Sequence, residues 1–353
     1  MHPAVVFAII TMVFAGIVRA QTQSIQVNGE TRTFVLHAPS GLSNPPLVIS
    51  MHGASGTGSQ QQSMSGFDKI ADREKFVVVY PDGINKRWDL SGTKDLNFIM
   101  AIIDTMYARY QIDRNRVYPT GFSMGGMMSY TLACKAADKI AAIGPCSGYP
   151  MGGLGGCSPV RPVPILHVHG EGDDLVTYSG LAAIISGWVS KNSCPTTAVV
   201  TKPYPADNAN SKATKNYYGP CKEGSEIILI TIAGMGHAYA SSINTYGINA
   251  SEELWAFFKT HPSTVGVSNK ASSVSTARHT SADYYAGTIH LHSGENFTDV
   301  RVFDIQGKTL CTWKAGGDPV SAAVLPFNRP VGGMYLLDVT NVKGHTTVSV
   351  VVP

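Results

Sequence analysis

Residues 121–125 read Gly-Phe-Ser-Met-Gly and match the pattern G-x-S-x-G. In this pattern a serine lies on a strained strand-to-helix turn, where a side chain at either glycine would clash. The apolar pair Val117 and Tyr118 precedes the motif, and a run compatible with a helix follows it. The motif therefore predicts a nucleophile at Ser123, although a plain glycine-rich turn explains many isolated matches.

A serine nucleophile needs a base to take its proton, and the base needs a carboxylate to fix its tautomer. His237 follows the apolar run 227–232 and is the candidate base; the alternative is a histidine of a surface loop. The candidate acids follow the apolar run 165–168 and are Glu171, Asp173 and Asp174. The resulting chain order, serine then acid then histidine, is that of α/β-hydrolases. Both loops follow predicted strands, and catalytic groups of open α/β sheets gather at the carboxyl ends of the strands.

The oxyanion of an acyl-transfer reaction needs two backbone donors. The first candidate is the N–H of Met124, directly after the nucleophile. The second is the N–H of Ala54, in the glycine-rich loop 51–56 that follows an early strand. In that loop His52 is expected to hold the backbone by hydrogen bonding rather than to act as a base. His169 is expected to be a structural histidine at a strand end.

Apolar runs that we expect to be buried strands alternate with helical patterns. The runs are Leu47–Ile49, Phe76–Tyr80, Val117–Tyr118, Ile165–Val168 and Ile227–Ile232. Asn28-Gly29 predicts a type I′ hairpin turn near the start, and residues 96–110 show helical spacing. A helix is predicted to end near Arg73, and Asn249 to Glu252 predicts a capping box opening a helix that Pro262 stops. The alternation predicts an α/β fold with a mainly parallel sheet covered on both faces.

The chain has 353 residues, and 27 Lys and Arg against 24 Asp and Glu give a net charge of +3. This balance argues against a nucleic-acid partner, and 44% hydrophobic residues argue against disorder. Residues 1–20 contain a mostly apolar run ending in Val18-Arg19-Ala20, which predicts a cleaved signal peptide, with an uncleaved anchor as the alternative. No later stretch is apolar enough to span a membrane.

Six cysteines are typical of an oxidising compartment. We favour a Cys194–Cys221 disulfide, because these residues flank one Pro- and Tyr-rich insertion, and we expect Cys311 to stay unpaired. The α/β part is predicted to span 21–262. Nine of the nineteen residues in 263–281 are Ser or Thr, which predicts a linker. Residues 282–353 are patterned as short strands and predict a small all-β domain, a sandwich.

Residues 25 to 260 resemble the secreted esterase group of feruloyl esterases, acetylxylan esterases of carbohydrate esterase family 1 and polyhydroxybutyrate depolymerases. The matching stretches are His52-Gly53, Tyr80 to Gly83, Trp88-Asp89, Asp95 to Ile99, Arg116 to Tyr118, Gly121 to Met128, His169-Gly170 with Asp173, and Gly236-His237. The resemblance implies an α/β-hydrolase with Ser123 as nucleophile, Asp173 as acid and His237 as base. It selects Asp173 because the family places its acid four residues after the His of His-Gly.

The same resemblance implies that Trp88 lines the substrate cleft, with a buried core tryptophan as the alternative. The chain departs from the family pattern at Pro119, before the nucleophile, and at Tyr239, where the family often has Trp. We expect Tyr239 to contribute to the leaving-group pocket. The implied substrates are esters of plant cell-wall polysaccharide, with feruloyl ranked before acetyl and polyester third. No cofactor or metal is expected, and a serine peptidase or a non-catalytic binding protein are the alternatives.

The C-terminal region resembles the sorting domain of type IX secretion. The similarity rests on residues 300–308 and on Gly333 to Leu337. It implies the secretion machinery as a partner and delivery to the cell surface or the medium. A carbohydrate-binding module is the alternative, and it would present surface aromatic residues; the candidates are Trp313, Tyr284 and Tyr285.

Overall fold

The computed structural model describes residues 21–263 and six segments of the C-terminal region. These segments are 280–285, 288–304, 308–315, 320–327, 333–341 and 344–352. The chain divides into two compact units, 1–269 and 270–353. The predicted signal peptide lies outside the described residues, and so does most of the predicted linker. The last two residues of that linker belong to strand β11 (Thr280–Tyr285).

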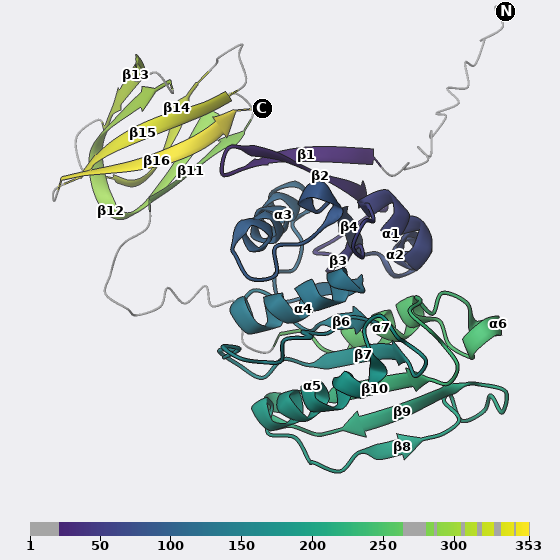
Figure 1. Cartoon of the computed structure of the whole chain (residues 1–353). Coiled ribbons are helices and arrows are strands. Elements are labelled where there is room, and N and C mark those ends of the chain that lie inside the picture. The colour runs from purple at the N-terminus through teal and green to yellow at the C-terminus, as the bar shows by residue number, and fades with distance from the viewer. Residues whose placement is uncertain are drawn as a thin grey trace, which may run out of the picture. The chain divides into compact units, whose positions relative to one another are not determined.

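Within residues 21–263, ten strands form one mixed sheet (Figure 1). In chain order they are β1 (Gln21–Val27), β2 (Glu30–His37), β3 (Leu47–Met51), β4 (Val77–Pro81), β5 (Val117–Phe122), β6 (Gly144–Cys146), β7 (Ile165–Gly170), β8 (Val199–Thr201), β9 (Ala213–Tyr218) and β10 (Ile227–Ile232). Their order in the sheet is β1-β2-β4-β3-β5-β6-β7-β10-β9-β8. The central strands from β4 to β10 are parallel, and antiparallel pairs extend both edges. The predicted mainly parallel sheet is confirmed.

Helices cover both faces of this sheet, as predicted (Figure 1). One face carries α3 (Lys94–Tyr110), α4 (Met124–Lys135) and α5 (Tyr178–Lys191), and the other carries α1 (Gly58–Ser65), α2 (Phe67–Glu74) and α7 (Ala250–Phe258). The shorter helices are α6 (Ile243–Tyr246), η1 (Ile84–Lys86) and η2 (Lys222–Gly224). Successive side chains of a strand point to opposite faces of the sheet. Ile49 therefore packs in the core on the face covered by α3, α4 and α5, and Val48 packs on the face covered by α1, α2 and α7.

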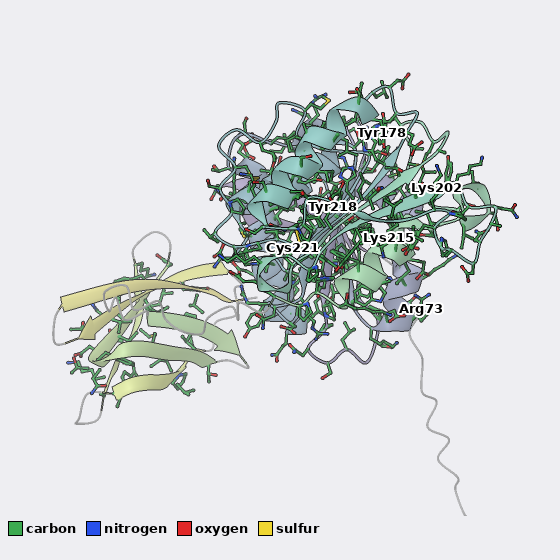
Figure 2. All side chains as sticks on the ribbon, turned by 90° about the horizontal axis from the view of Figure 1, so that it is seen from below. Arg73, Tyr178, Lys202, Lys215, Tyr218 and Cys221 are labelled. Carbon is green, nitrogen blue, oxygen red and sulfur yellow. A yellow bond between two sulfur atoms is a disulfide. The ribbon has the colours of Figure 1, made fainter. Side chains whose placement is uncertain are left out.

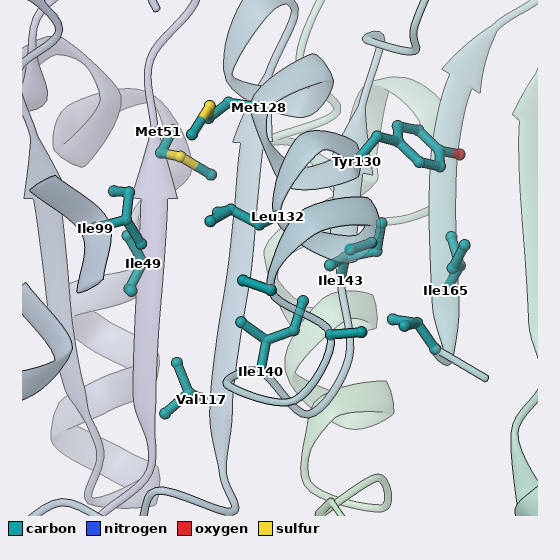
Figure 3. Close-up of a cluster of buried hydrophobic side chains, with 14 of the residues drawn as sticks. Ile49, Met51, Ile99, Val117, Met128, Tyr130, Leu132, Ile140, Ile143 and Ile165 are labelled. Carbon is teal, nitrogen blue, oxygen red and sulfur yellow. The ribbon is translucent and has the colours of Figure 1, made fainter. Parts of the chain in front are cut away.

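The core beneath α4 is closely filled. Figure 3 shows Met51 of β3 and Met128 of α4 beside each other, with Leu132 one turn further along the helix. All three side chains are fully buried. Because α4 begins directly after Ser123, this packing holds the turn that carries the serine.

The local predictions are tested by turns and caps. Asn28 and Gly29 both have positive φ, at 51° and 83°, as a type I′ hairpin requires, so the predicted hairpin is confirmed. The helix expected to end near Arg73 is two helices, α1 and α2, because the chain turns at Gly66 with φ 64°. Asn249 caps α7 as predicted, but the Glu252 carboxylate accepts two hydrogen bonds from Arg73 of α2.

Two disulfides tie loops to this frame. The predicted Cys194–Cys221 bond is confirmed, and it closes the segment that contains β8 and β9 (Figure 2). A Cys134–Cys157 bond was not predicted, and it joins the end of α4 to the loop that follows β6. Neither disulfide includes Cys311.

The C-terminal unit is antiparallel and all-β. Its described strands are β11, β12 (Thr288–Phe303), β13 (Thr309–Lys314), β14 (Val320–Pro326), β15 (Gly333–Asn341) and β16 (Gly344–Val352). The short apolar runs that predict strands here, 300–303, 310–313, 335–339 and 347–352, lie in β12, β13, β15 and β16. The six described strands form one sheet, in which β12 pairs with β11, β13, β14 and β15, and β16 pairs with β15. Trp313 is half-buried against Phe297 of the core, and the side chains of Tyr284 and Tyr285 lie outside the described residues.

Across the described ranges of both units, no helix combines the length and the apolar character needed to cross a bilayer.

Candidate active site

Ser123 lies on a strained turn between β5 and α4. Its φ of 53° and ψ of −118° place a non-glycine residue in a costly backbone region. Two hydrogen bonds hold this conformation: the Ser123 N–H donates to Cys146 O at 2.9 Å, and the Met127 N–H donates to Ser123 O at 3.0 Å. The strain is therefore maintained by β6 on one side and by the first turn of α4 on the other.

The glycines of the motif are required by close backbone contacts. A Cβ atom at Gly125 would lie 2.1 Å from Met51 O, and one at Gly121 would lie 2.5 Å from the same oxygen. Real Cβ atoms do not approach backbone oxygens so closely, so the turn packs against the end of β3 only without these side chains. Gly148 plays the same part from the loop after β6, because its Cβ would lie 1.9 Å from Ser123 O. Sequence analysis did not single out Gly148.

The three predicted triad residues are brought together by strands far apart in sequence. The Nε2 atom of His237 is 2.9 Å from Ser123 Oγ, and its Nδ1 atom is 2.8 Å from Asp173 Oδ2. His237 follows β10 and Asp173 follows β7, and these two strands are parallel neighbours. The ring of Phe122 packs against the imidazole of His237 with centroids 4.9 Å apart.

Of the three candidate acids, only Asp173 contacts the histidine. Its Oδ1 atom accepts hydrogen bonds from the backbone N–H groups of Leu175, at 3.1 Å, and Val176, at 2.9 Å. The residue is 5% exposed, so its carboxylate is held by these donors and by His237 rather than by water. Asp174 is exposed, and the Glu171 carboxylate accepts the Thr231 hydroxyl at 2.8 Å.

The two predicted oxyanion donors are the N–H of Met124, directly after the serine, and the N–H of Ala54, next to a glycine that approaches the serine. Met124 is the first residue of α4, so its N–H belongs to the helix terminus and has no intrahelical partner. Ala54 is exposed and follows Gly53, whose Cβ would lie 3.2 Å from Ser123 Cβ. Among the described residues, no backbone carbonyl accepts the Ala54 N–H. Both donors are thus close to the serine and available for a ligand.

His52 organises the loop that carries Ala54. Its Nδ1–H donates to Gly53 O at 2.7 Å, its Nε2 accepts the Gly83 N–H at 3.0 Å, and its carbonyl accepts the Trp88 indole N–H at 2.7 Å. The carbonyl of Gly53 can only accept a hydrogen bond, and the backbone N–H of Gly83 can only donate one. The His52 ring therefore carries its hydrogen on Nδ1 alone and is neutral. Burial lowers the pKa of His52, which favours the same neutral form. His52 therefore has the loop-holding geometry expected of it.

Trp88 and Tyr239, the predicted substrate-binding residues, are both buried. Trp88 is 3% exposed and its ring packs on His52 at 4.8 Å, which favours the alternative of a core tryptophan. Tyr239 is 6% exposed, and its hydroxyl bonds Ser251 Oγ at 2.8 Å. The Tyr239 ring meets Phe122 edge-on at 6.4 Å. Both side chains pack against neighbours of the catalytic residues, Trp88 against His52 and Tyr239 against Phe122.

Two further supports of the site involve Ser147 and His167, which the sequence patterns did not single out, and His169, which has the structural role expected of it. The Ser147 hydroxyl donates to Ala238 O at 3.0 Å and ties the loop after β6 to the residue that follows His237. His167 and His169 form a buried hydrogen-bonded pair beneath the acid loop. Their sequence signal was the alternation His-x-His, which puts both side chains on one face of β7.

This arrangement can activate a hydroxyl. A serine, an imidazole and a buried carboxylate are hydrogen-bonded in series. The N–H of Met124 directly follows the serine, and the N–H of Ala54 follows Gly53, which approaches the serine. Such a set can form a covalent adduct at a carbonyl carbon and stabilise the oxyanion that results.

Comparisons with known proteins support the resemblance to the esterase group. Residues 32–163 match the family model described as "Esterase PHB depolymerase". The chain is 41% identical over 217 residues to a bifunctional acetylxylan esterase/xylanase of Neocallimastix patriciarum, covering 61% of this chain and 32% of that protein. It is 31% identical over 237 residues to feruloyl esterase B of Piromyces equi, covering 59% of this chain and 42% of that protein. The chain thus spans less than half the length of these relatives.

Solved structures agree on the fold. An acetyl xylan esterase from Aspergillus awamori superposes with a TM-score of 0.54 at 17% identity, covering 68% of this chain and 99% of that chain. The first unit therefore has the α/β-hydrolase fold, and the C-terminal unit adds a small antiparallel β-structure. The predicted fold class is confirmed.

Proposed function

We propose that this chain is a secreted serine carboxylic-ester hydrolase that acts through an acyl-enzyme. The observation that carries the proposal is the hydrogen-bonded series Ser123, His237 and Asp173, assembled on a strained turn at the carboxyl edge of the sheet. Similarity to proteins named as acetylxylan and feruloyl esterases supports ester hydrolysis over a peptidase or a binding protein.

In this mechanism Ser123 Oγ attacks the ester carbonyl while His237 Nε2 takes its proton. Asp173 holds the imidazole in the tautomer that leaves Nε2 free to accept, and it stabilises the imidazolium. The N–H groups of Ala54 and Met124 stabilise the oxyanion. His237 then protonates the leaving alcohol, and a water molecule repeats the sequence to release the acid.

The proposed substrates are esters on plant cell-wall polysaccharide. Met151 and Leu175 are 62% and 68% exposed on loops that follow β6 and β7, at the edge where the serine lies. Exposed apolar side chains there suit an aromatic acyl group, so we rank feruloyl first. The relative with acetylxylan esterase in its name makes acetyl the second candidate. Polyester is the third, from the family model.

The test is to assay the purified protein on methyl ferulate, acetylated xylan, a short polyhydroxybutyrate and a peptide amide. Ser123→Ala is the matched control, and it should lower kcat by several orders of magnitude while the protein stays folded, with about 10³-fold residual catalysis over water. A serine-directed phosphonate should label only the wild type. Unchanged turnover in the variant, or cleavage of the peptide alone, would contradict the proposal.

We further propose that residues 1–20 direct export and that the C-terminal unit serves sorting by type IX secretion. The support is the apolar leader and the sequence likeness of residues 300–308 and 333–337. If the unit binds carbohydrate instead, its removal should weaken retention on insoluble xylan and leave export unchanged.

A further inference from the structure

A buried chain of hydrogen bonds runs beneath the acid loop, residues 173–176. Tyr130 of α4 bonds His167 Nδ1 at 2.9 Å, and His167 Nε2 is 3.0 Å from His169 Nδ1. His169 Nε2 is 2.8 Å from Val176 O. Figure 3 shows the Tyr130 side chain extending from α4 toward the strand that carries Ile165, which is β7. No step of the proposed mechanism uses these three side chains.

The contacts permit one arrangement of protons. Val176 O is a carbonyl and only accepts, so His169 Nε2 must carry the hydrogen. In a neutral ring His169 Nδ1 then accepts, and His167 Nε2 must donate to it. By the same reasoning His167 Nδ1 accepts the Tyr130 hydroxyl. Every donor in the chain therefore points toward the acid loop.

Both histidines are held neutral by their surroundings. Tyr130, His167 and His169 are all fully buried, and burial lowers the pKa of each histidine. The His167 pKa is lowered further by its neighbour His169. Burial also raises the pKa of Tyr130, so its hydroxyl keeps the proton that it donates. The hydrogen bonds from Tyr130 to Val176 thus keep a single donor-to-acceptor direction at the pH where the enzyme would work.

The end of the chain lies at the catalytic acid. His169 Nε2 is also 3.4 Å from Asp173 Oδ2, the same oxygen that faces His237. The carbonyl held by His169 belongs to Val176, whose N–H donates to the other carboxylate oxygen, Asp173 Oδ1. The position of Val176 therefore sets the position of the carboxylate. A shift of the acid loop would turn Asp173 away from the imidazole.

We propose that Tyr130, His167 and His169 form a positioning relay that fixes the acid loop and aims Asp173 at His237. The relay touches no substrate and exchanges no proton during turnover. For its kinetic consequences the inference rests on the proposed esterase function. Its structural consequence, the quality of the Asp173–His237 hydrogen bond, does not depend on any substrate.

The central variant is His169→Phe, which keeps an aromatic ring and removes both relay hydrogen bonds of the imidazole, the one that Nε2–H donates to Val176 O and the one that Nδ1 accepts from His167. Since misplacement of a catalytic group by about 1 Å can cost about 100-fold, we expect kcat on methyl ferulate to fall about 100-fold with KM unchanged. His169→Gln can still offer an N–H to Val176 O and should recover about tenfold of that loss. Tyr130→Phe removes one hydroxyl and should lower kcat by about threefold to tenfold, because the rest of the relay keeps its packing.

The matched control is Tyr80→Phe. It removes a buried tyrosine hydroxyl that bonds Asp68 of α2 at 2.7 Å and has no hydrogen bond to a triad or relay residue, so it should leave kcat unchanged. Circular dichroism and thermal unfolding establish that each variant is folded. If His169→Phe does not fold, His169→Gln and Tyr130→Phe carry the test.

The deciding readout is the proton NMR resonance of His237 Nδ1–H, assigned by its loss in His237→Ala. A hydrogen bond to a carboxylate moves this proton far downfield, so it should shift upfield or vanish in the His169 variants and persist in Tyr80→Phe. An unchanged resonance in a folded His169→Phe, a kcat within twofold of wild type, or a change in KM alone would overturn the relay. If the wild type hydrolyses no ester, the proposed function fails while the resonance still decides the relay.

Discussion

Replacing Asp173 by Asn should nearly abolish turnover, because the surroundings dictate how the amide must lie. The Oδ1 position receives the N–H groups of Leu175 and Val176, so the amide oxygen has to occupy it. The amide NH₂ is then forced to the Oδ2 position, 2.8 Å from His237 Nδ1. Two N–H donors cannot bond each other, so His237 must adopt the tautomer with its hydrogen on Nε2. That tautomer cannot take the proton of Ser123.

The magnitude follows from this wrong tautomer. Loss of the correct tautomer costs about 10⁴ in kcat in a serine protease triad, or about 5.4 kcal/mol of barrier. His169 Nε2–H, 3.4 Å from the same position, adds a second donor that disfavours the amide. We therefore expect at least this loss for Asp173→Asn, with KM little changed.

The assay is steady-state hydrolysis of one soluble ester, such as methyl ferulate, near neutral pH. Asp174→Asn is the matched control, because Asp174 is adjacent and exposed, and it should cost about tenfold at most. A larger loss in Asp174→Asn than in Asp173→Asn would refute the reasoning and move the acid by one position. A loss below tenfold in a folded Asp173→Asn would show that the acid does not set the tautomer.

Three further expectations concern the frame. Gly125→Ala should give little folded, active protein, since its Cβ would lie 2.1 Å from Met51 O; wild-type yield and kcat would contradict this. His167 and His169 have lowered pKa values in the fold and take up protons when unfolded below about pH 6.5. The free energy of unfolding from urea titrations should therefore fall as pH drops below 6.5, by up to about 1.4 kcal/mol per unit for each histidine, and an unchanged slope after replacing both would count against this. Deleting residues 264–353 should spare hydrolysis of a small soluble ester, and loss of that activity in a folded truncation would show that the two units depend on each other.

Local patterns were sufficient for much of the architecture. Runs such as Ile227–Ile232 are long and apolar enough to be read as buried strands, and Asn28-Gly29 suits one turn type through its backbone freedom alone. The motif around Ser123 could be predicted for the same reason, because it depends on glycines that are neighbours in the chain. Sequence order then placed acids after one strand and His237 after another.

Local sequence patterns could not predict which residues far apart in the chain contact each other in the fold. Three acids followed the same strand, and the geometry around Val176 and His237 decided which of them turns inward. Trp88 has the same sequence signal whether it lines a cleft or packs in the core, and its bond to His52 O arises only when two loops meet. The carboxylate of Glu252 bonds Arg73, which is 179 residues away, instead of completing its local cap.

The histidine relay shows the physical reason for this division. His-x-His in a strand already puts two rings on one face, since side chains alternate along β7. Their tautomers, their neutrality and their direction depend on Tyr130 from a helix and on Val176 from a loop, which the sheet brings within hydrogen-bond distance. Turns and periodicities are short-range and can be read from neighbouring residues. Burial and hydrogen-bond direction are properties of the packed chain, because both depend on atoms that only the tertiary fold places side by side.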